Sequence, residues 1–392
     1  MLETKSIDTT FHKLPLRALR PLTSDSVMLT FGVPKHLEAS YQFVPGQYLT
    51  LRTVIDGKRV SRCYSICSSA DSGVLSVAIR QVENGQFSSH AVSQFAVNDV
   101  IEVMPPMGQF TLSPNRNGLS VVSDTTLVSK RCYAGVAGGS GITPIMSMIT
   151  TVMSVESKSH FVLFYANRSE QSMMFRDELI EMQAMYQGRF HLVPIYSDSA
   201  ESEQLIHHAV ASVLHNDITG LTQAGADKIP TNLTSILNQL PDLNTADSWY
   251  LCGPQGMTDR LQQVLINNGV NNSDIQRELF TADTSKRTEV SPGVKKTSEV
   301  SSQIKVIFEG QRIEFDLEKR GEVVLNEALK YRDDLPHACQ FGACGTCKAK
   351  IVEGSADMKD NMALEDEEIE AGYILTCQAQ PTSQVLALSF DD

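Results

Sequence analysis

Four cysteines near the carboxyl end of the chain constrain its fold more than any other feature. Gaps of four, two and 29 residues separate them along the sequence. A 2Fe-2S cluster needs four thiolates that converge on a small volume, and this spacing suits that requirement. Gly342 and Gly345 lie between them, where backbone amides must approach the sulfur atoms closely. We therefore predict a 2Fe-2S cluster with the ligands Cys339, Cys344, Cys347 and Cys377.

A tetrahedral zinc site is the alternative for the same four cysteines. Structural zinc sites usually present two C-x-x-C pairs, and this sequence has one, at Cys344 and Cys347. The segments HACQFGACGTC and ILTCQA resemble a plant-type ferredoxin domain that covers residues 303–392. The resemblance implies a low-potential carrier of single electrons. Cys63, Cys67 and Cys132 lack ligand spacing, and we expect them to be small buried hydrophobic residues.

The charge of the chain bears on its partners. The net charge is -13, and residues 303–392 hold 18 acidic and 9 basic side chains. Such an excess argues against nucleic acid as a partner, because phosphates are bound chiefly by Lys and Arg. The acidic segment is either a solvated surface or a docking face for a basic protein. The first ten residues lack a basic segment followed by an apolar core, and no apolar run is long enough to span a membrane, so we expect a cytoplasmic protein.

Near the end of a strand pattern, residues 62–65 read Arg-Cys-Tyr-Ser and resemble the R-x-Y-S flavin motif of the ferredoxin-NADP reductase superfamily. The resemblance implies that Arg62 pairs with a flavin phosphate. It also implies that Tyr64 stacks on the isoalloxazine ring and that Ser65 hydrogen-bonds near the reactive ring nitrogen.

A second element follows about twenty residues later. The segment GQFSS resembles the phosphate-binding element of the same superfamily, in which amides at a helix start receive a pyrophosphate. This element favours FAD over FMN, although the related phthalate-type reductases use FMN. The residues that we expect to bind the cofactor here are Gly85, Phe87, Ser88 and Ser89.

A glycine-rich stretch, GVAGGSGITP, occupies residues 135–144 between a strand pattern and a helix pattern. A lone glycine-rich loop often only turns the chain. This one resembles the superfamily's own version of a nicotinamide dinucleotide loop, placed at an amide-rich helix start. The residues implied in binding are Gly138, Gly139, Gly141, Thr143 and Pro144.

Two further matches lie toward the end of this region. Residues 251–254 (Leu-Cys-Gly-Pro) end a strand pattern, where ligands gather in parallel sheets. In the superfamily this cysteine lies beside the nicotinamide. The segment Glu278-Leu279-Phe280 resembles the closing segment near the flavin, and a plain edge strand is its alternative. The implied site residues are Cys252, Gly253, Pro254, Met257, Glu278 and Phe280.

The choice between NADPH and NADH depends on the residues that meet the ribose 2′ position. A carboxylate there suits a hydroxyl, and an arginine suits a phosphate. Arg168 follows the second strand pattern, no acidic residue precedes Glu170 at this turn, and Arg176 lies further along. We therefore favour NADPH, with a solvated Arg168 as the alternative.

The hydrophobic pattern divides the chain into three domains and a linker. Residues 11–126 show short alternating strands and are predicted to form an antiparallel β-barrel that binds FAD. Residues 127–281 alternate strands with helices, which predicts an α/β doubly wound parallel sheet that binds NAD(P)H. Residues 282–302 are polar and form a linker, and residues 303–392 are predicted to be an α+β, β-grasp ferredoxin domain. The parallel-strand candidates are 132–136, 161–165, 192–196 and 249–252, and the helix candidates include 173–186 and 257–268.

The motifs together predict an electron-transfer enzyme. Hydride passes from NAD(P)H to FAD, and single electrons then pass through the cluster to a partner oxygenase or hydroxylase. Reductases of this kind resemble those of aromatic-ring and Rieske oxygenases and the reductase components of phenylacetyl-CoA epoxidases. We assign Ser65, Thr143, Cys252 and Glu278 to positioning and electrostatics around the stacked rings. A stand-alone diaphorase that reduces quinones and a redox-sensing module remain as alternatives.

Overall fold

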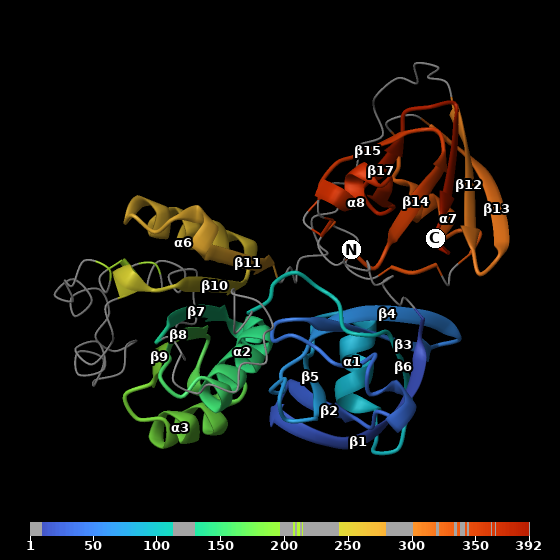
Figure 1. Cartoon of the computed structure of the whole chain (residues 1–392). Helices are drawn as coiled ribbons and strands as arrows, with labels where there is room; N and C mark the ends of the chain where they lie inside the picture. Colours follow the sequence, from blue (N-terminus) through green and yellow to red (C-terminus); the bar gives the residue numbers. More distant parts are fainter. Residues whose placement is uncertain are drawn as a thin grey trace.

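The computed structural model shows three folded units that follow one another along the chain (Figure 1). It describes residues 10–112, 130–196, 207, 210–211, 214, 243–279, 301–318, 321–332, 335–337, 342, 345–361, 363–364 and 366–391. Within these parts, none of the helices combines the length and the apolar character needed to cross a membrane.

The first unit is a six-stranded antiparallel sheet with the order β4-β3-β6-β1-β2-β5. An isolated bridge between Ile66 and Val77 brings together the two ends of this order. Leu14, Leu29 and Leu49 are fully buried inside, and α1 packs against this core through Phe87. The predicted antiparallel flavin-domain fold is confirmed. Its elements are β1 (His12–Thr23), β2 (Ser26–Phe31), η1 (Lys35–Leu37), β3 (Tyr48–Ile55), β4 (Lys58–Ser65), β5 (Leu75–Arg80), α1 (Gln86–Ser93) and β6 (Val100–Val103).

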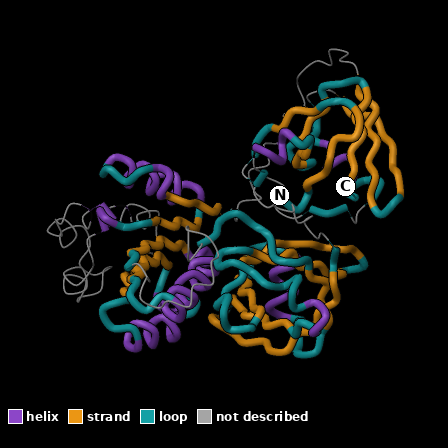
Figure 2. Tube along the Cα trace, viewed as in Figure 1, coloured by secondary structure: helices purple, strands orange, loops and turns teal. Residues whose placement is uncertain are grey.

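The second unit is a five-stranded parallel sheet with the order β11-β10-β7-β8-β9. Figure 2 shows α6 on one side of this sheet and α2 and α3 on the other, as expected for a doubly wound fold. All four predicted parallel strands are present. The elements are β7 (Cys132–Gly138), η3 (Gly139–Gly141), α2 (Ile142–Val155), β8 (His160–Asn167), η4 (Glu170–Ser172), α3 (Arg176–Met185), β9 (Phe190–Tyr196), η5 (Leu243–Thr245), β10 (Ser248–Gly253), α6 (Gln255–Asn267), η6 (Asn272–Asp274) and β11 (Ile275–Leu279).

One helix begins later than its sequence pattern predicts. The hydrophobic pattern predicts a start at residue 173, but α3 begins at Arg176. Phe175 has a φ of 59°, in the left-handed region, and so cannot belong to the helix. Met173, Met174 and Phe175 are buried as an irregular segment, which explains why their apolar character looked helical.

The third unit joins two small sheets, with the orders β13-β12-β18-β14-β16 and β15-β17. Glu309 and Gly310, with φ of 52° and 68°, turn the hairpin between β12 and β13. Strand β18 lies parallel to β12, which gives the predicted mixed α+β arrangement. The elements are β12 (Ser301–Phe308), β13 (Gln311–Glu318), α7 (Val324–Ala328), β14 (Lys348–Glu353), β15 (Ala356–Met358), α8 (Asp366–Glu370), β16 (Tyr373–Leu375), β17 (Ala379–Pro381) and β18 (Val385–Ser389).

The first two units share a hydrophobic core, whereas the third has its own. Cys67, Ala78 and Phe110 of the antiparallel unit pack in the same cluster as Ile145 and Met148 of α2. The core of the third unit contains residues from β12 onward. The antiparallel and parallel units are therefore held together by apolar burial, and the third is attached by a smaller contact that is described below.

Candidate functional site

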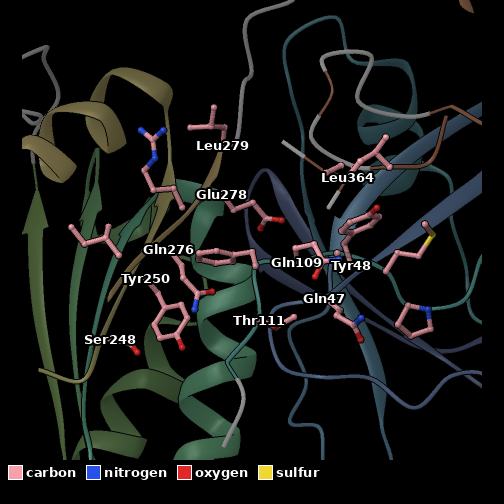
Figure 3. A pocket seen from close by; sticks show the side chains of 18 of the residues that line it. Gln47, Tyr48, Gln109, Thr111, Ser248, Tyr250, Gln276, Glu278, Leu279 and Leu364 are labelled. Carbon is pink, nitrogen blue, oxygen red and sulfur yellow. The ribbon is translucent and has the colours of Figure 1, made fainter. Parts of the chain in front are cut away.

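A cavity of about 910 Å³ lies where the three units meet. Tyr48 borders it from the antiparallel unit, Glu278 from the parallel sheet, and Gly345, Lys348 and Leu364 from the third unit. Figure 3 shows Glu278 extending from the parallel-sheet side toward the side that carries Tyr48. A volume of this size falls in the range of cofactor and ligand pockets.

Three of the predicted site residues converge around Glu278, which borders this cavity. Ser65 ends β4 and is buried, and Cys252 and Glu278 face each other across the ladder between β10 and β11. The Ser65 hydroxyl donates a hydrogen bond to Oε2 of Glu278 at 3.3 Å. The Cys252 thiol donates to the same oxygen at 3.9 Å. The carboxyl ends of two parallel strands thus meet the end of the R-x-Y-S strand.

Burial dominates the electrostatics of this trio. Desolvation raises the pKa of Glu278 to about 8, against the opposing effect of the hydrogen bonds from Ser65 and Cys252. Burial also raises the pKa of the Cys252 thiol well above its usual value, and the neighbouring Glu278 adds to the rise. Below pH 8 the site therefore holds a protonated carboxyl and a neutral thiol. A thiol in this state is not a nucleophile, which agrees with a positioning role.

The glycine-rich loop packs against the strand end that carries Cys252. A Cβ at Gly141 would lie 2.3 Å from the Cys252 carbonyl oxygen, and a Cβ at Gly138 would lie 2.9 Å from Cδ of Pro254. A Cβ at Gly138 or Gly253 would also lie 3.0 Å or 2.6 Å from Cε of Met257. These glycines are needed because two strand-end loops approach each other closely.

The other loop positions have local roles. Gly139 has a φ of 54° and Gly253 a φ of 157°, and the Gly139 carbonyl accepts a hydrogen bond from Tyr165 at 3.0 Å. The Thr143 hydroxyl is buried and donates to the Ser140 carbonyl at 3.1 Å. Pro144 occupies the first turn of α2, where its missing N–H is not needed.

The R-x-Y-S strand and α1 supply the features that a flavin phosphate requires. The Arg62 side chain is exposed, and its Nη1 donates to the Ser61 carbonyl. The ring of Tyr64 lies 5.5 Å from that of Phe87, which ties β4 to α1. Gly85 precedes the first turn of α1, where unpaired amides favour an anion. An exposed guanidinium and an open helix start fit the phosphates of FAD.

The two serines of this element make local contacts. The Ser88 hydroxyl accepts from the Val82 amide at 3.1 Å and lies 3.3 Å from the Gly85 carbonyl. Ser89 Oγ accepts from Nε2 of Gln81 at 3.1 Å. Ser88 therefore shapes the turn before α1 from a buried position, whereas Ser89 remains partly accessible.

The cysteine-bearing loop is described in part. Cys347 and Cys377 are buried, whereas Cys339 and Cys344 lie outside the described residues. Thr376 joins the two described cysteines, because its amide and its hydroxyl both donate to the Cys347 carbonyl. Nε2 of Gln378 lies 3.7 Å from the Cys377 sulfur, as a donor to a cluster ligand would. Gly342 and Gly345 have φ of 84° and 66°, so the turns between the ligands require glycine.

The arginines considered for nucleotide selection do not line this cavity. Arg168 is exposed at the end of β8. Arg176 is occupied, because its guanidinium donates to Glu170 at 2.8 Å and to Asp177 at 2.7 Å. Phe280 lies outside the described residues.

Sequence reasoning missed one set of contacts. Thr50 and Thr346 meet across the boundary between the first and third units, and Cys63 lies beside both. The prediction that Cys63 is a buried hydrophobic residue is wrong, since its thiol is half-buried and within hydrogen-bonding distance of Thr50. Cys132 is also half-buried, and only Cys67 fits the expectation. No sequence signal announces such a contact, because its members are nearly 300 residues apart.

Comparisons with known proteins assign a family to each unit. An oxidoreductase FAD-binding domain matches residues 13–112, and an oxidoreductase NAD-binding domain matches residues 136–263. A 2Fe-2S iron-sulfur cluster binding domain matches residues 306–382. Phthalate dioxygenase reductase has a similar fold, with a TM-score of 0.52 and 22% identity over 97% of this chain and 98% of its own.

Two curated relatives match along almost their whole length. The ferredoxin reductase component of 3-ketosteroid-9-alpha-monooxygenase from Rhodococcus rhodochrous is 27% identical over 96% of both chains. A component of 1,2-phenylacetyl-CoA epoxidase from Escherichia coli K12 is 34% identical over 390 residues, or 98% of both chains. The chain therefore belongs to the same family as this 1,2-phenylacetyl-CoA epoxidase component, within the ferredoxin-NADP reductase superfamily and with a C-terminal plant-type ferredoxin domain.

Proposed function

We propose that the protein is the reductase component of an oxygenase system, which takes hydride from NAD(P)H and delivers single electrons to its partner through a 2Fe-2S cluster. NAD(P)H gives up a hydride, that is, two electrons and one proton, in the first step. The later steps pass the two electrons on singly, and the proton is released to solvent. Bound FAD supplies the chemistry that connects these steps, because a flavin accepts an electron pair and releases the electrons one at a time.

One observation carries this proposal. The same short strand, β4, contributes Ser65 to the contact with Glu278 and Cys63 to the contact with Thr346. The nucleotide-side residues and the loop of the cluster ligands therefore both reach the flavin motif. An arrangement of this kind suits electron transfer from a nucleotide to an iron-sulfur cluster.

The residues of the chain hold and orient the reactants. Arg62 and the start of α1 at Gly85 would hold the FAD phosphates. Tyr64 would stack on the isoalloxazine ring. The buried Cys252 and the half-buried Glu278 would border the nicotinamide and present a neutral thiol and a protonated carboxyl to it. Cys339, Cys344, Cys347 and Cys377 would hold the cluster.

NADPH is the proposed reductant. Arg168 is exposed at the end of β8, where the ribose 2′ substituent lies in parallel sheets that bind nucleotides. The pairing of Arg176 with Glu170 and Asp177 leaves Arg168 as the better candidate for a 2′-phosphate.

The relatives suggest the electron acceptor, and the cysteine ligands suggest the compartment. The oxygenase and monooxygenase names of the relatives suggest an oxygenase or hydroxylase as the electron acceptor. We place the protein in the cytoplasm, because cysteine ligands are best preserved in a reducing compartment.

Anaerobic visible spectroscopy of the purified protein tests the function. Flavin bands with 2Fe-2S shoulders should bleach together on addition of NADPH, and more slowly with NADH. A flavin-only or colourless protein would contradict the cluster assignment and support the zinc alternative. Rapid reduction of quinones, with no electron delivery to a co-encoded oxygenase, would instead support the diaphorase.

A further inference from the structure

The contact between the first and third units is made by three small polar side chains. The Oγ1 atoms of Thr50 and Thr346 are 3.3 Å apart. The sulfur of Cys63 lies 3.4 Å from Oγ1 of Thr50 and 3.6 Å from Oγ1 of Thr346. Each of the three atoms is therefore within hydrogen-bonding distance of the other two. We call Thr50, Cys63 and Thr346 the polar triangle.

The residues of the polar triangle belong to two functional segments of the chain. Cys63 is the variable residue of the R-x-Y-S motif, and Thr50 is its direct partner across the ladder between β3 and β4. Thr346 immediately precedes Cys347, a predicted cluster ligand. The triangle therefore joins the strand that carries Tyr64 and Ser65 to the loop that carries the cluster.

The two threonines of the triangle are buried, whereas Cys63 is half-buried. Thr50 is 1% exposed and Thr346 is 2% exposed. Cys63 packs against the buried Tyr48, which Met107 also contacts. A buried hydroxyl that loses its partner is costly, because it cannot be compensated by solvent. The two hydroxyls therefore favour a single docked arrangement of the units.

We propose that the polar triangle positions the cluster loop against the flavin motif and so sets the rate at which single electrons leave the flavin for the cluster. This inference rests on the proposed function and adds specific positioning residues to it. In this inference Thr50 and Thr346 act through docking, by the contacts that join the two units. The step that they serve moves one electron from the reduced flavin to the oxidised cluster and forms no bond.

The test uses the full-length protein loaded with FAD and cluster, in the variants Thr50→Val, Thr346→Val and the double variant. Valine keeps the shape of threonine and removes the hydroxyl. In anaerobic stopped-flow experiments with NADPH, flavin reduction should keep its wild-type rate. Cluster reduction should slow several-fold in each single variant, because the rate of electron tunnelling falls as the distance between the flavin and the cluster increases.

Three comparisons separate docking from other effects. The rate effect of the double variant should be smaller than the product of the two single effects, because both changes break the shared Thr50–Thr346 contact, whereas the Cys63–Thr346 contact survives in Thr50→Val. Thr346→Ser keeps the hydroxyl and should restore most of the rate. Thr30→Val removes a hydroxyl that bonds to Ser76 within the antiparallel unit and should leave both rates unchanged.

A second readout does not depend on turnover. Amide hydrogen exchange in residues 345–348 should accelerate in Thr50→Val, although this substitution lies in the other unit. The electron paramagnetic resonance spectrum of the dithionite-reduced cluster should stay the same in that variant, because the ligands are untouched. If Thr346→Val fails to load its cluster, Thr50→Val alone decides the question.

Wild-type exchange and wild-type cluster reduction in Thr50→Val would overturn the inference. Multiplying rate effects in the double variant would also contradict it, because independent effects mean separate contacts. A wild-type protein whose cluster is not reduced by NADPH would instead reject the proposed function, and the exchange experiment would still test the docking role.

Discussion

At the scale of single residues, Glu278 stands out because its carboxyl group has a raised pKa and accepts hydrogen bonds from Ser65 and Cys252. Its pKa lies near 8 in the folded chain, above the ordinary value of 4.5, mainly through desolvation. The folded state thus binds a proton more tightly than the unfolded state does. The contribution of the protonated Glu278 carboxyl to the free energy of unfolding is fully present below about pH 4.5. It is lost as the pH rises through 8.

The substitution Glu278→Gln should remove this dependence. We expect the stability of the wild type relative to the variant to fall as the pH rises from 5 to 8. The limit of the slope is about 1.4 kcal/mol per pH unit. The real slope should be smaller, because the Glu278 side chain borders the cavity and is partly exposed. Chemical unfolding of both proteins at several pH values measures it, and a difference that is constant with pH would show that Glu278 ionises normally.

Sequence reasoning works at this scale where a motif supplies the spacing. Ser65, Cys252 and Glu278 were predicted from separate motifs, and the structure places them around one carboxylate oxygen. It fails where a local ion pair competes, as with Arg176, whose partners Glu170 and Asp177 are ordinary surface residues in the sequence. The roles of the site residues stay predictions until they are tested.

At the scale of elements, the meeting of η3 and β10 explains part of the glycine-rich loop. Gly141 has a φ of -61°, which any residue can adopt, so its small size and not its backbone freedom is needed. The backbone of Cys252 fills the space where a side chain would start. The loop and the cysteine strand are thus one packed unit.

The substitution Gly141→Ala should therefore destabilise the protein by about 3 kcal/mol, at the upper end of the usual cost of overpacking. It should also slow hydride transfer, because the loop must move away from Cys252. Gly269→Ala is the control: its φ of 89° adds backbone strain, but a Cβ there meets nothing within 4 Å. Thermal unfolding and single-turnover flavin reduction measure both effects. A fully active and stable Gly141→Ala protein would show that the loops can separate freely.

Helices and strands could be predicted where the hydrophobic pattern of a short segment determines its structure. Four of the five parallel strands were recognised because buried apolar runs alternate with helices, and each proved longer than predicted. The fifth, β11 (Ile275–Leu279), was not predicted as part of the parallel sheet. The start of α3 was not predicted correctly, because packing, and not residue type, places Phe175 in the left-handed conformation that precedes the helix. Hydroxyl contacts between α2 and the antiparallel unit, such as that from Ser147 to the Ser68 carbonyl at 2.6 Å, were equally invisible in the sequence.

At the scale of the whole molecule, the hydrophobic cores group the three units into two parts. The antiparallel and parallel units share a core, and the rings of Phe110 and Tyr250 meet across their boundary at 5.8 Å. The third unit has a separate core and meets the others through the polar triangle and the cavity wall. The hydrophobic pattern of the sequence predicted three domains. It could not predict their grouping into two parts, because that grouping depends on contacts between segments that are distant in the sequence.

Denaturant unfolding should therefore show two transitions. Trp249, the single tryptophan of the chain, is fully buried in the parallel sheet, so its fluorescence reports on the larger part alone. Visible circular dichroism of the cluster reports on the third unit. We expect the cluster signal to disappear at a lower denaturant concentration, because a smaller domain buries a smaller fraction of its surface.

The variant Cys377→Ser, which removes a cluster ligand, should lose the cluster signal. The free energy of unfolding reported by Trp249 should stay within about 0.5 kcal/mol of wild type. Coincident transitions in the wild type, or a large shift of the Trp249 midpoint in this variant, would mean that the third unit supports the fold of the other two and that all three act as one cooperative body.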